Sequence, residues 1–404
     1  MASTTAPSQG DHNTPRPDRT RSADELLVGR DATITPELSV VMPTLNEEAG
    51  IRTCINWIKN AVEELQVPTE IIISDSSTDR TPEIAREMGA IVVEPDGKGY
   101  GYAYRYAFER TRGDYIAMGD ADTTYDFKQI PRLLDHLDET GADMVMGSRL
   151  AGEIEDGAMP PLHQHIGNPA LTRFLNLFYG AGVSDAHSGF RIFTRDAYET
   201  MEWETTGMEF ASEMIMEAGA KDLEIAEVPI VYHEREGEET LESFRDGWRH
   251  VRFMLVNAPG YLFSVPGLLL TIFGVAVMTV AHTGVALGEV TLGINSMIAG
   301  SLATIVGTQV GSLGVFATVA SDPIQQPDDP LTTGITEYAT LERGATAGVV
   351  VLVAGGAYAS WLVGNWILSG FDAVPFTSAA LVAFTAVVVG IQLVFSSFFL
   401  STVN

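Results

Sequence analysis

The stretch GDYIAMGDADTTYD, residues 113–126, places two carboxylates directly after a short apolar run. The run at residues 114–118 has the length and composition of a buried β-strand. Asp120 and Asp122 follow it, separated by Ala121, and carboxylates at this spacing can bind one hard divalent cation through oxygen ligands. Aspartate is also common in turns, so the pair by itself does not identify a metal site.

Four other apolar runs are predicted to be strands, with helical segments between them. Strands that alternate with helices in this way indicate an α/β domain whose mainly parallel sheet is covered on both faces. In such a sheet, ligands bind beyond the carboxyl ends of the strands. The other predicted strands are residues 38–42, 69–74, 90–94 and 142–146, and the helices are residues 47–65, 81–88, 101–111 and 130–137.

Polar residues cluster where these strands end, so we expect a single ligand site at that edge of the sheet. Asp75 can accept an N–H group of a nucleobase. Lys98 lies in a flexible, glycine-containing turn that can approach a phosphate. Asp79 is better suited to cap the helix that follows it. The clusters are residues 44–48, 75–79, 98–101 and 120–124.

Three arginines are candidate anion-binding residues because cations are scarce in this part of the chain. Arg149 follows the last predicted strand of the domain, Arg191 belongs to a Ser-Gly-Phe-Arg stretch, and Arg235 opens an Arg-Glu-Gly stretch. Guanidinium groups bind phosphate oxygens in a bidentate manner. Pairing of each arginine with a surplus carboxylate is the alternative.

The charge of the chain is strongly negative and unevenly distributed. Residues 38–259 carry 40 acidic and 19 basic residues, whereas residues 260–404 carry 7 and 1, within a net charge of −29. This balance disfavours nucleic-acid binding, which needs a basic surface. Surplus carboxylates with few lysines predict a halophilic source, where salt screens their repulsion. The single cysteine, Cys54, excludes an intrachain disulfide.

The last third of the chain is predicted to lie in a membrane. Four apolar segments are each long enough to cross a hydrocarbon core of about 30 Å. Before them, apolar residues interleave with Arg245, Arg249 and Arg252, which predicts an amphipathic helix at the membrane interface. The positive-inside rule then places the α/β domain in the cytoplasm. The predicted spans are residues 261–281, 297–320, 345–368 and 376–400.

These patterns divide the chain into four parts. Whether the last two spans belong with the first two or form an addition is left open by the sequence. The predicted parts are a disordered polar tail at residues 1–37, the α/β domain at 38–239, the interface helix at 240–257 and the transmembrane domain at 258–404.

Together these stretches resemble family 2 glycosyltransferases of the GT-A fold, and most closely the dolichol-phosphate mannose/glucose synthase group. The matching stretches occur in the expected order over about residues 38–255. They are VVMPTLNEEAGI (40–51), IIISDSSTDRTPEIA (71–85), GKGYGYAYRYAF (97–108), GDYIAMGDADTTYD (113–126), MGSRL (146–150) and SDAHSGFRIF (184–193).

The resemblance and the charge pattern give a set of candidate site residues. Asp120 and Asp122 would hold Mg²⁺ or Mn²⁺, and Asp122 and Asp185 are the candidate catalytic residues. The donor-binding candidates are Pro43, Leu45, Glu47, Asp75, Lys98, Asp120, Ala121 and Asp122. The candidates for the acceptor phosphate are Arg149, Ser188, Arg191 and Arg235.

Three positions depart from the family pattern. Ser74 stands where the family usually has a second acidic residue before Asp75, and Thr124 stands where it often has glutamine. The stretch at residues 235–240 lacks the lysine that the family carries there. The base of the donor and the contacts to the acceptor phosphate can therefore differ from those of the family.

The predicted activity is the inverting, metal-dependent transfer of one sugar from a nucleotide-sugar, of the UDP-glucose or GDP-mannose type, to polyprenyl or dolichyl phosphate. The product would be a lipid-linked sugar for surface glycosylation. The expected partners are the donor, the lipid acceptor and the bilayer, with a homo-oligomer left open. A processive polysaccharide synthase, which normally carries a Gln-X-X-Arg-Trp motif absent here, and a non-catalytic nucleotide-binding membrane scaffold are the alternatives.

Overall fold

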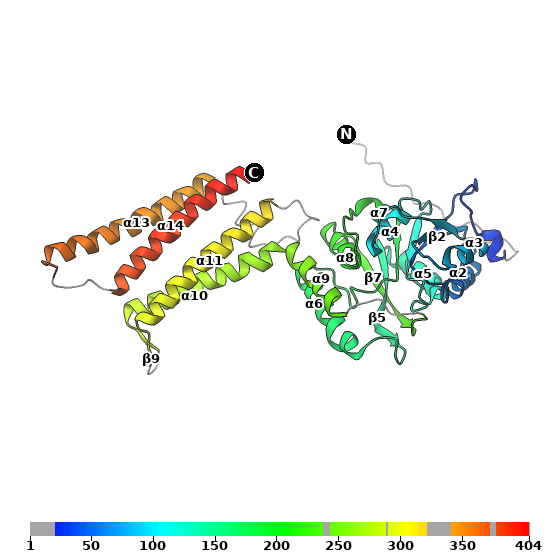
Figure 1. Ribbon diagram of the computed structural model, residues 1–404, viewed down its shortest axis with the longest axis horizontal. Coiled ribbons are helices and arrows are strands. Elements are labelled where there is room, and N and C mark those ends of the chain that lie inside the picture. Colours follow the sequence, from blue (N-terminus) through cyan, green and yellow to red (C-terminus); the bar gives the residue numbers. More distant parts are fainter. Residues whose placement is uncertain (1–20, 237–242, 288–289, 321–340, 372–376, 404) are drawn as a thin grey trace, which may run out of the picture.

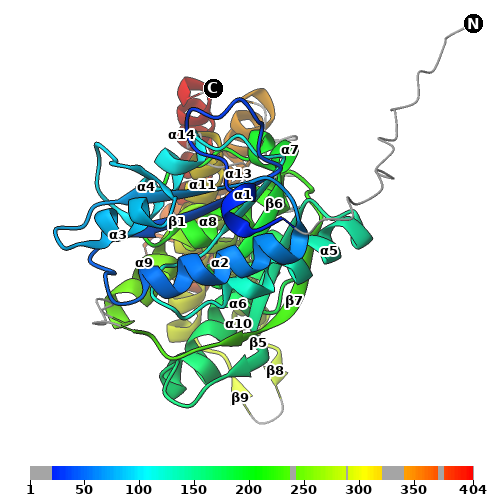
Figure 2. The same ribbon diagram turned by 90° about the vertical axis from the view of Figure 1, so that its right-hand side faces the viewer.

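The computed structural model describes residues 21–236, 243–287, 290–320, 341–371 and 377–403. It consists of an α/β lobe and a bundle of long helices that extends away from one side of the lobe (Figure 1). Figure 2, which looks along the long axis, shows the long helices behind the lobe.

The lobe is built on a seven-stranded sheet with the order β3-β2-β1-β4-β6-β5-β7. Six strands are parallel, and β6 runs antiparallel between β4 and β5. This confirms the predicted mainly parallel α/β fold. The strands are β1 Leu38–Thr44, β2 Thr69–Asp75, β3 Ile91–Val93, β4 Tyr115–Met118, β5 Met144–Ile154, β6 Arg191–Thr194 and β7 Ile225–Tyr232, with a small hairpin of β8 Ala286–Leu287 and β9 Val290–Thr291 elsewhere.

Helices cover both faces of the sheet, as expected for a parallel sheet without a solvent face. The helices of the lobe are α1 Ala23–Leu26, α2 Ile51–Leu65, α3 Thr81–Glu87, α4 Tyr100–Phe108, α5 Ile130–Thr140, α6 Asn168–Tyr179, α7 Arg195–Thr200 and α8 Phe210–Ala220, with a 3₁₀ turn Phe127–Gln129 and a π turn His163–Gly167. After the lobe come α9 Ser243–Val256, a π turn Gly260–Ser264, α10 Val265–Thr283, α11 Ile294–Ala320, α13 Leu341–Leu368 and α14 Thr377–Val403.

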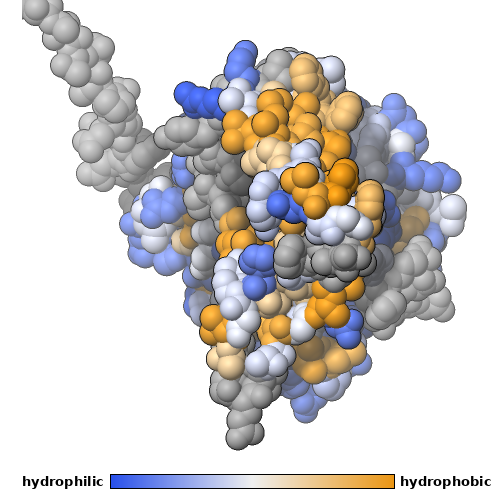
Figure 3. Space-filling view, turned by 90° about the vertical axis from the view of Figure 1, so that its left-hand side faces the viewer, coloured by the Kyte–Doolittle hydropathy of each residue, from blue (hydrophilic) through white to orange (hydrophobic). Residues whose placement is uncertain are grey.

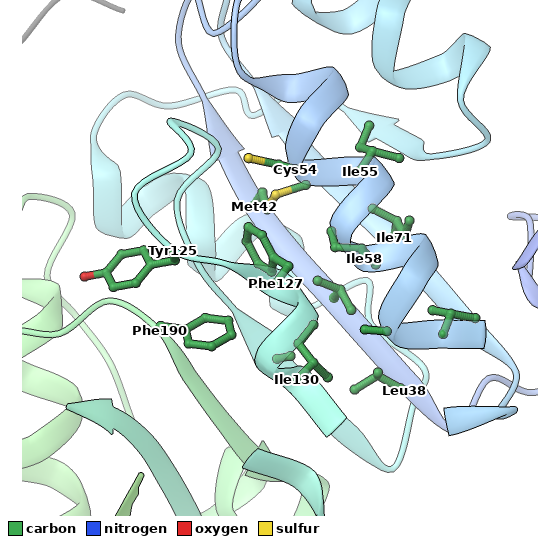
Figure 4. Packing of buried hydrophobic residues seen from close by; sticks show 14 of the residues in the cluster. Leu38, Met42, Cys54, Ile55, Ile58, Ile71, Tyr125, Phe127, Ile130 and Phe190 are labelled. Atoms are coloured by element: carbon green, nitrogen blue, oxygen red, sulfur yellow. The ribbon is translucent and has the colours of Figure 1, made fainter. Parts of the chain in front are cut away.

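Alternate side chains of the central strand β1 enter two separate cores, because successive residues of a strand point to opposite faces. Val40 and Met42 pack with residues of α2 and α5, and Figure 4 shows Met42 beside Cys54 and Ile55 of α2. Val41 packs on the other face with residues of α4 and α8. The two cores fix β1, β2 and β4 side by side, so their carboxyl ends form one edge.

Residues 21–28, which belong to the predicted disordered tail at residues 1–37, are ordered and pack on the lobe. Leu26 of α1 is 2% exposed, and Leu27 forms a bridge with Thr69 at the start of β2. The Ala23 N–H group also donates to Glu63 of α2 at 3.0 Å. Although this stretch is mostly polar, a few of its apolar residues pack into the first of the two cores. Residues 1–20 lie outside the described part.

Among the residues that the structure describes, four helices are long and apolar enough to cross a membrane, and this confirms the four predicted spans to within a few residues. They are Leu262–Thr283, Ile294–Thr318, Glu342–Leu368 and Ser378–Thr402. Figure 3, seen from the side of this bundle, shows apolar residues over much of its surface. The predicted interface helix over 240–257 corresponds to α9, with residues 240–242 outside the described part.

The last span, α14, packs against the first pair and also carries α13. Glycines bring α10 and α11 together closely, since a Cβ added at Gly274 would lie 2.5 Å from the Gly300 carbonyl oxygen. Between α11 and α14, the hydroxyls of Ser301 and Thr385 lie 2.6 Å apart, and the Gln392 amide donates to the Gln309 side chain at 3.1 Å. Such interhelical polar pairs stabilise helix association in a bilayer.

Gly274→Ala should destabilise the helix bundle, because the new Cβ would lie 2.4 Å from the Thr304 hydroxyl. Overpacking of this kind typically costs about 1–3 kcal/mol. Gly356→Ala on α13 is the matched control, since no atom lies within 4 Å of a Cβ there. Thermal unfolding of the two variants in detergent measures the difference. Equal melting temperatures would contradict the close packing of α10 on α11.

Candidate active site

The loops that follow β1 and β2 are joined by hydrogen bonds at the carboxyl edge of the sheet. The Thr44 hydroxyl donates to Asp75 at 2.7 Å, and the Asn46 N–H group donates to the Ser77 hydroxyl at 2.8 Å. Asn46 adopts a left-handed conformation with φ of 61°, which an asparagine tolerates well. Asp79 accepts from the N–H group of Thr81, which agrees with its expected capping role.

Asp75 is therefore held in place by Thr44 and is 5% exposed. It ends β2, which is separated from β4 by one strand, so it lies roughly 10 Å across the sheet from the residues that follow β4. That separation suits a ligand with one end near Asp75 and the other near Asp120. Asp75 as a contact to a nucleobase stays a prediction.

Asp120 is half-buried and lies beside two tyrosines. The hydroxyl groups of Tyr100 and Tyr104 donate to its Oδ1 atom at 2.9 and 3.3 Å. Its Oδ2 atom lies beside Gly189, where an added Cβ would be only 3.3 Å away. One carboxylate oxygen is thus fixed by two tyrosine hydroxyls, and the other accepts no hydrogen bond from the residues that the structure describes.

Asp122 is held in the same way by its own loop. The backbone N–H and hydroxyl of Thr124 both donate to Asp122 Oδ1, the hydroxyl at 2.6 Å. Gly50, at the start of α2, packs against this loop so closely that a Cβ would lie 2.8 Å from the Ala121 carbonyl oxygen. The Asp122 Oδ2 atom faces Arg235 Nη1 at 3.5 Å.

Arg235 joins the loop after β1 to the loop after β4. Its Nη2 atom donates to Glu47 Oε1 at 2.7 Å, and its Nη1 atom faces Asp122. The backbone of the next residue is anchored too, because the Glu236 N–H group donates to the Asp122 carbonyl oxygen at 3.1 Å. Glu47, a candidate donor-binding residue, therefore lies with the carboxylate pair.

The electrostatics show that this cluster holds more negative charge than the protein neutralises. Burial raises the pKa of Glu47 to about 7, with Asp122 and Asp120 adding to the rise and Arg235 opposing it. Burial and the neighbouring charge of Asp122 likewise raise the pKa of Asp120 to about 6. A cation in addition to Arg235 would therefore be favoured here.

Arg149 and Asp185 form a buried ion pair. Arg149 Nε and Nη2 donate to the two carboxylate oxygens at 2.7 and 2.8 Å, and the Arg149 backbone N–H adds a third bond. Burial alone would raise the pKa of Asp185, but Arg149 outweighs it and the pKa lies below its usual range. Asp185 is fully buried, so it orients Arg149 and leaves Nη1 outside the pair. Its catalytic role stays a prediction.

Two further acceptor-phosphate candidates are fully buried. Arg191 donates through Nε and Nη2 to carbonyl oxygens of Ser188, Ala186 and Ala211. Its Nη1 atom has no hydrogen-bond partner in the described part of the chain. The Ser188 hydroxyl lies 3.5 Å from the Phe190 N–H group. Both side chains therefore stabilise the loop before β6. Their contact with the acceptor phosphate stays a prediction.

The other donor-binding candidates lie at the same edge but differ in exposure. Leu45 is 59% exposed and Lys98 is also exposed, whereas Ala121 is buried. Pro43, within β1, is half-buried. A cavity of about 600 Å³ lies beside β2 and β3, lined in part by Arg30, Arg110 and Arg112, and none of the site carboxylates lines it.

The donor set at Asp120 and Asp122 fits a hard divalent cation. Within the described residues no group of three or more His, Cys, Asp and Glu side chains is arranged to hold a metal. Mg²⁺ commonly uses only one or two carboxylates and takes its other ligands from phosphate and water. Two carboxylates with one oxygen each held by hydroxyl groups, in a site of raised pKa values, match that pattern.

Sequence reasoning missed the tyrosines and the partner of Glu47. Tyr100 and Tyr104 lie one turn apart in the stretch GYGYAYRYAF, and that i, i+4 spacing after a glycine turn was the available signal. No sequence signal connects Glu47 with Arg235, which lies 188 residues later.

Comparison with known proteins bears on both parts of the chain. The sequence profile described as glycosyl transferase family 2 matches residues 39–201, and that of the family 2 C-terminal transmembrane region matches residues 315–404. The low-salt glycan biosynthesis hexosyltransferase Agl6 of Haloferax volcanii is 62% identical over 99% of this chain and 97% of its own length. A dolichyl-phosphate hexose transferase of the same organism is 37% identical over 52% of this chain and 89% of its own length.

Among solved structures, glucosyl-3-phosphoglycerate synthase from Mycobacterium tuberculosis, in complex with Mn²⁺, UDP and its product, is similar to the lobe. It is 24% identical, the match covers 55% of this chain and 79% of that chain, and the TM-score is 0.45.

Glu47 and Asp120 should make the metal-free protein less stable as the pH rises from about 4 to about 7. Glu47 and Asp120 have folded-state pKa values of about 7 and about 6, above the ordinary values of 4.5 and 3.8. At these two groups the folded state therefore binds more protons than the unfolded state in this window, and their contribution to the free energy of unfolding falls as the pH rises. Glu47→Gln should flatten this fall, as measured by chemical unfolding in the presence of a chelator.

Glu64→Gln, an exposed change at the end of α2 that is farther from Glu47, is the control and should leave the pH dependence as in the wild type. Identical slopes for the wild type and Glu47→Gln would contradict the assignment of a strained charge to Glu47.

Proposed function

The chain belongs to glycosyl transferase family 2, and we propose that it transfers a single hexose from a nucleotide-sugar to a polyprenyl phosphate of the dolichyl type. The observation that carries the proposal is the pair Asp120 and Asp122, each with one oxygen held by hydroxyl groups, on a lobe followed by four spans. The names of the two Haloferax relatives support the hexose and the lipid carrier.

Donor binding is proposed to extend along the carboxyl edge of the sheet. Asp75 would accept from the base, and Asp120 and Asp122 would hold Mg²⁺ or Mn²⁺ against the diphosphate. When bound, that cation supplies positive charge to the departing nucleoside diphosphate. The tyrosine hydroxyls on Asp120 and the Thr124 hydroxyl on Asp122 fix the carboxylates before the donor arrives.

Arg149 is the best-supported contact for the acceptor phosphate. Asp185 holds its guanidinium in one orientation, and Tyr232 lies beside it with the ring centroid 5.3 Å from the guanidinium carbon. A lipid phosphate is already an anionic nucleophile at neutral pH. The enzyme then needs to position it in line with the anomeric carbon rather than to deprotonate it. Such a direct displacement inverts the configuration of the sugar.

The lobe also offers an apolar surface toward the span helices. Figure 1 places α6 and α9 at the end of the lobe that faces them. Leu162, Ile166 and Leu177, in or before α6, are each more than 60% exposed, and Trp248 of α9 is 59% exposed. We infer that this surface rests in the headgroup region, where a polyprenyl phosphate presents its phosphate.

The protein is a membrane protein, and its catalytic lobe is proposed to face the cytoplasm. The arginines of α9 directly before the first span support this orientation through the positive-inside rule.

A processive polysaccharide synthase remains the second candidate from the sequence, and product size separates the two. Purified enzyme supplied with labelled donor, metal and dolichyl phosphate should give a lipid that carries one sugar. A polymer would defeat the proposal.

Asp122→Ala should lower the rate of sugar transfer to dolichyl phosphate by about 100-fold or more, the loss typical when an electrostatic contact to the transition state is removed. Asp135→Asn, an exposed change on α5, is the control and should keep the wild-type rate. The readout is labelled lipid extracted into organic solvent. Full activity in Asp122→Ala would show that the metal assignment is wrong.

A further inference from the structure

Two of the three neighbouring carboxylates at the carboxyl edge of the sheet pair with one guanidinium. Asp120 and Asp122 are two residues apart in the loop after β4, and Arg235 links Asp122 to Glu47 of the loop after β1. Arg235 lies 2.7 Å from Glu47 and 3.5 Å from Asp122, and among the described residues no other cation forms an ion pair with this cluster. Arg235 thus already neutralises part of the negative charge that a divalent cation would neutralise.

The guanidinium of Arg235 is held incompletely. The 3.5 Å separation from Asp122 is longer than the usual charge-assisted hydrogen bond of about 2.7–2.9 Å. The Arg235 Nε atom is buried without a hydrogen-bond partner in the described part of the chain. A buried donor without a hydrogen bond costs free energy, so this position of the guanidinium is not fully stabilised.

The backbone around Arg235 is fixed, whereas its guanidinium has a short contact with Glu47 and a long one with Asp122. The His233 N–H group donates to the Thr124 carbonyl oxygen at 3.0 Å, and the Glu236 N–H group donates to the Asp122 carbonyl oxygen at 3.1 Å. These bonds keep Arg235 next to the Asp-X-Asp loop while its long side chain can turn between neighbouring anions.

We propose that Arg235 is a resident counter-ion of this carboxylate cluster and that it competes with the divalent cation. Binding of the cation displaces the guanidinium from Asp122, and the displaced guanidinium then binds the phosphate groups that arrive beside the metal. Arg235 is a positioning residue in this scheme and couples metal binding to phosphate binding. The inference rests on the proposed function, because it takes Asp120 and Asp122 as the metal ligands.

Competition between Arg235 and the divalent cation predicts opposite effects on metal binding and on phosphate binding, which a purely structural role of Arg235 does not. Loss of the charge in Arg235→Gln leaves three carboxylates without their counter-ion, so the donor-free protein should bind Mn²⁺ more tightly. The same variant also lacks the guanidinium that would bind the phosphate groups. It should therefore bind pyrophosphate more weakly in the presence of Mn²⁺. A residue that only held the site together would weaken both.

The test is a titration of the full chain in detergent with Mn²⁺, in which electron paramagnetic resonance reports the free ion. Arg235→Gln should bind Mn²⁺ at least about 5-fold more tightly than the wild type, the lower end of coupling between linked sites. A calorimetric titration with pyrophosphate at saturating Mn²⁺ should show weaker binding. Arg132→Gln, which removes an exposed cation bonded to the Pro229 carbonyl oxygen, should match the wild type in both.

Arg235→Lys retains the charge and should stay near the wild type, which separates loss of charge from loss of folding. Unchanged or weaker Mn²⁺ binding in Arg235→Gln, with a melting temperature like that of the wild type, would overturn the inference. Failure of the proposed metal site looks different. In that case the wild type and Asp122→Ala would bind Mn²⁺ equally, whatever Arg235 does.

Discussion

Repulsion among the carboxylates at the edge of the sheet is the constraint on which the site depends. Glu47 follows β1, whereas Asp120 and Asp122 follow β4, and the parallel pairing of these two strands brings them to one place. Burial and mutual repulsion raise the pKa values of Glu47 and Asp120. Such a cluster destabilises the folded state but favours the binding of a cation. Perturbed pKa values of this kind typically cluster at functional sites.

The surrounding structure keeps the carboxylates in position despite that repulsion. Tyr100 and Tyr104 hold Asp120, Thr124 holds Asp122, and the segment after β7 hydrogen-bonds to the same loop. Farther along the edge, the bidentate pair of Arg149 with Asp185 provides a fixed guanidinium in a lobe that is otherwise acidic. The site therefore has a carboxylate region, which is proposed to hold a metal, and a separate cationic region, which is proposed to bind an anion.

The fold and the outline of the site could be predicted from sequence because they follow from local patterns. The run before Asp120 and its spacing predicted β4 and the carboxylate pair, and the four spans followed from length and apolar composition alone. The pairings could not be predicted, because they join distant segments. No sequence feature near Arg235 indicates Glu47 as its partner. The sequence predicts Arg149 and Asp185 as separate ligands, whereas in the fold Asp185 lies just before the antiparallel strand β6 and pairs with Arg149. The ordered start at residues 21–28 was missed because only a few apolar residues in a polar stretch contact the core.

The central claim is that Asp120 and Asp122 hold one divalent cation against a diphosphate. The anomalous scattering of Mn²⁺ in crystals grown with a nucleoside diphosphate tests it most directly. The account predicts a single strong peak between these two side chains and the diphosphate, with metal–oxygen distances near 2.2 Å, roughly as for other hard divalent cations. A bound diphosphate with the metal peak elsewhere, or with no peak at these carboxylates, would contradict it.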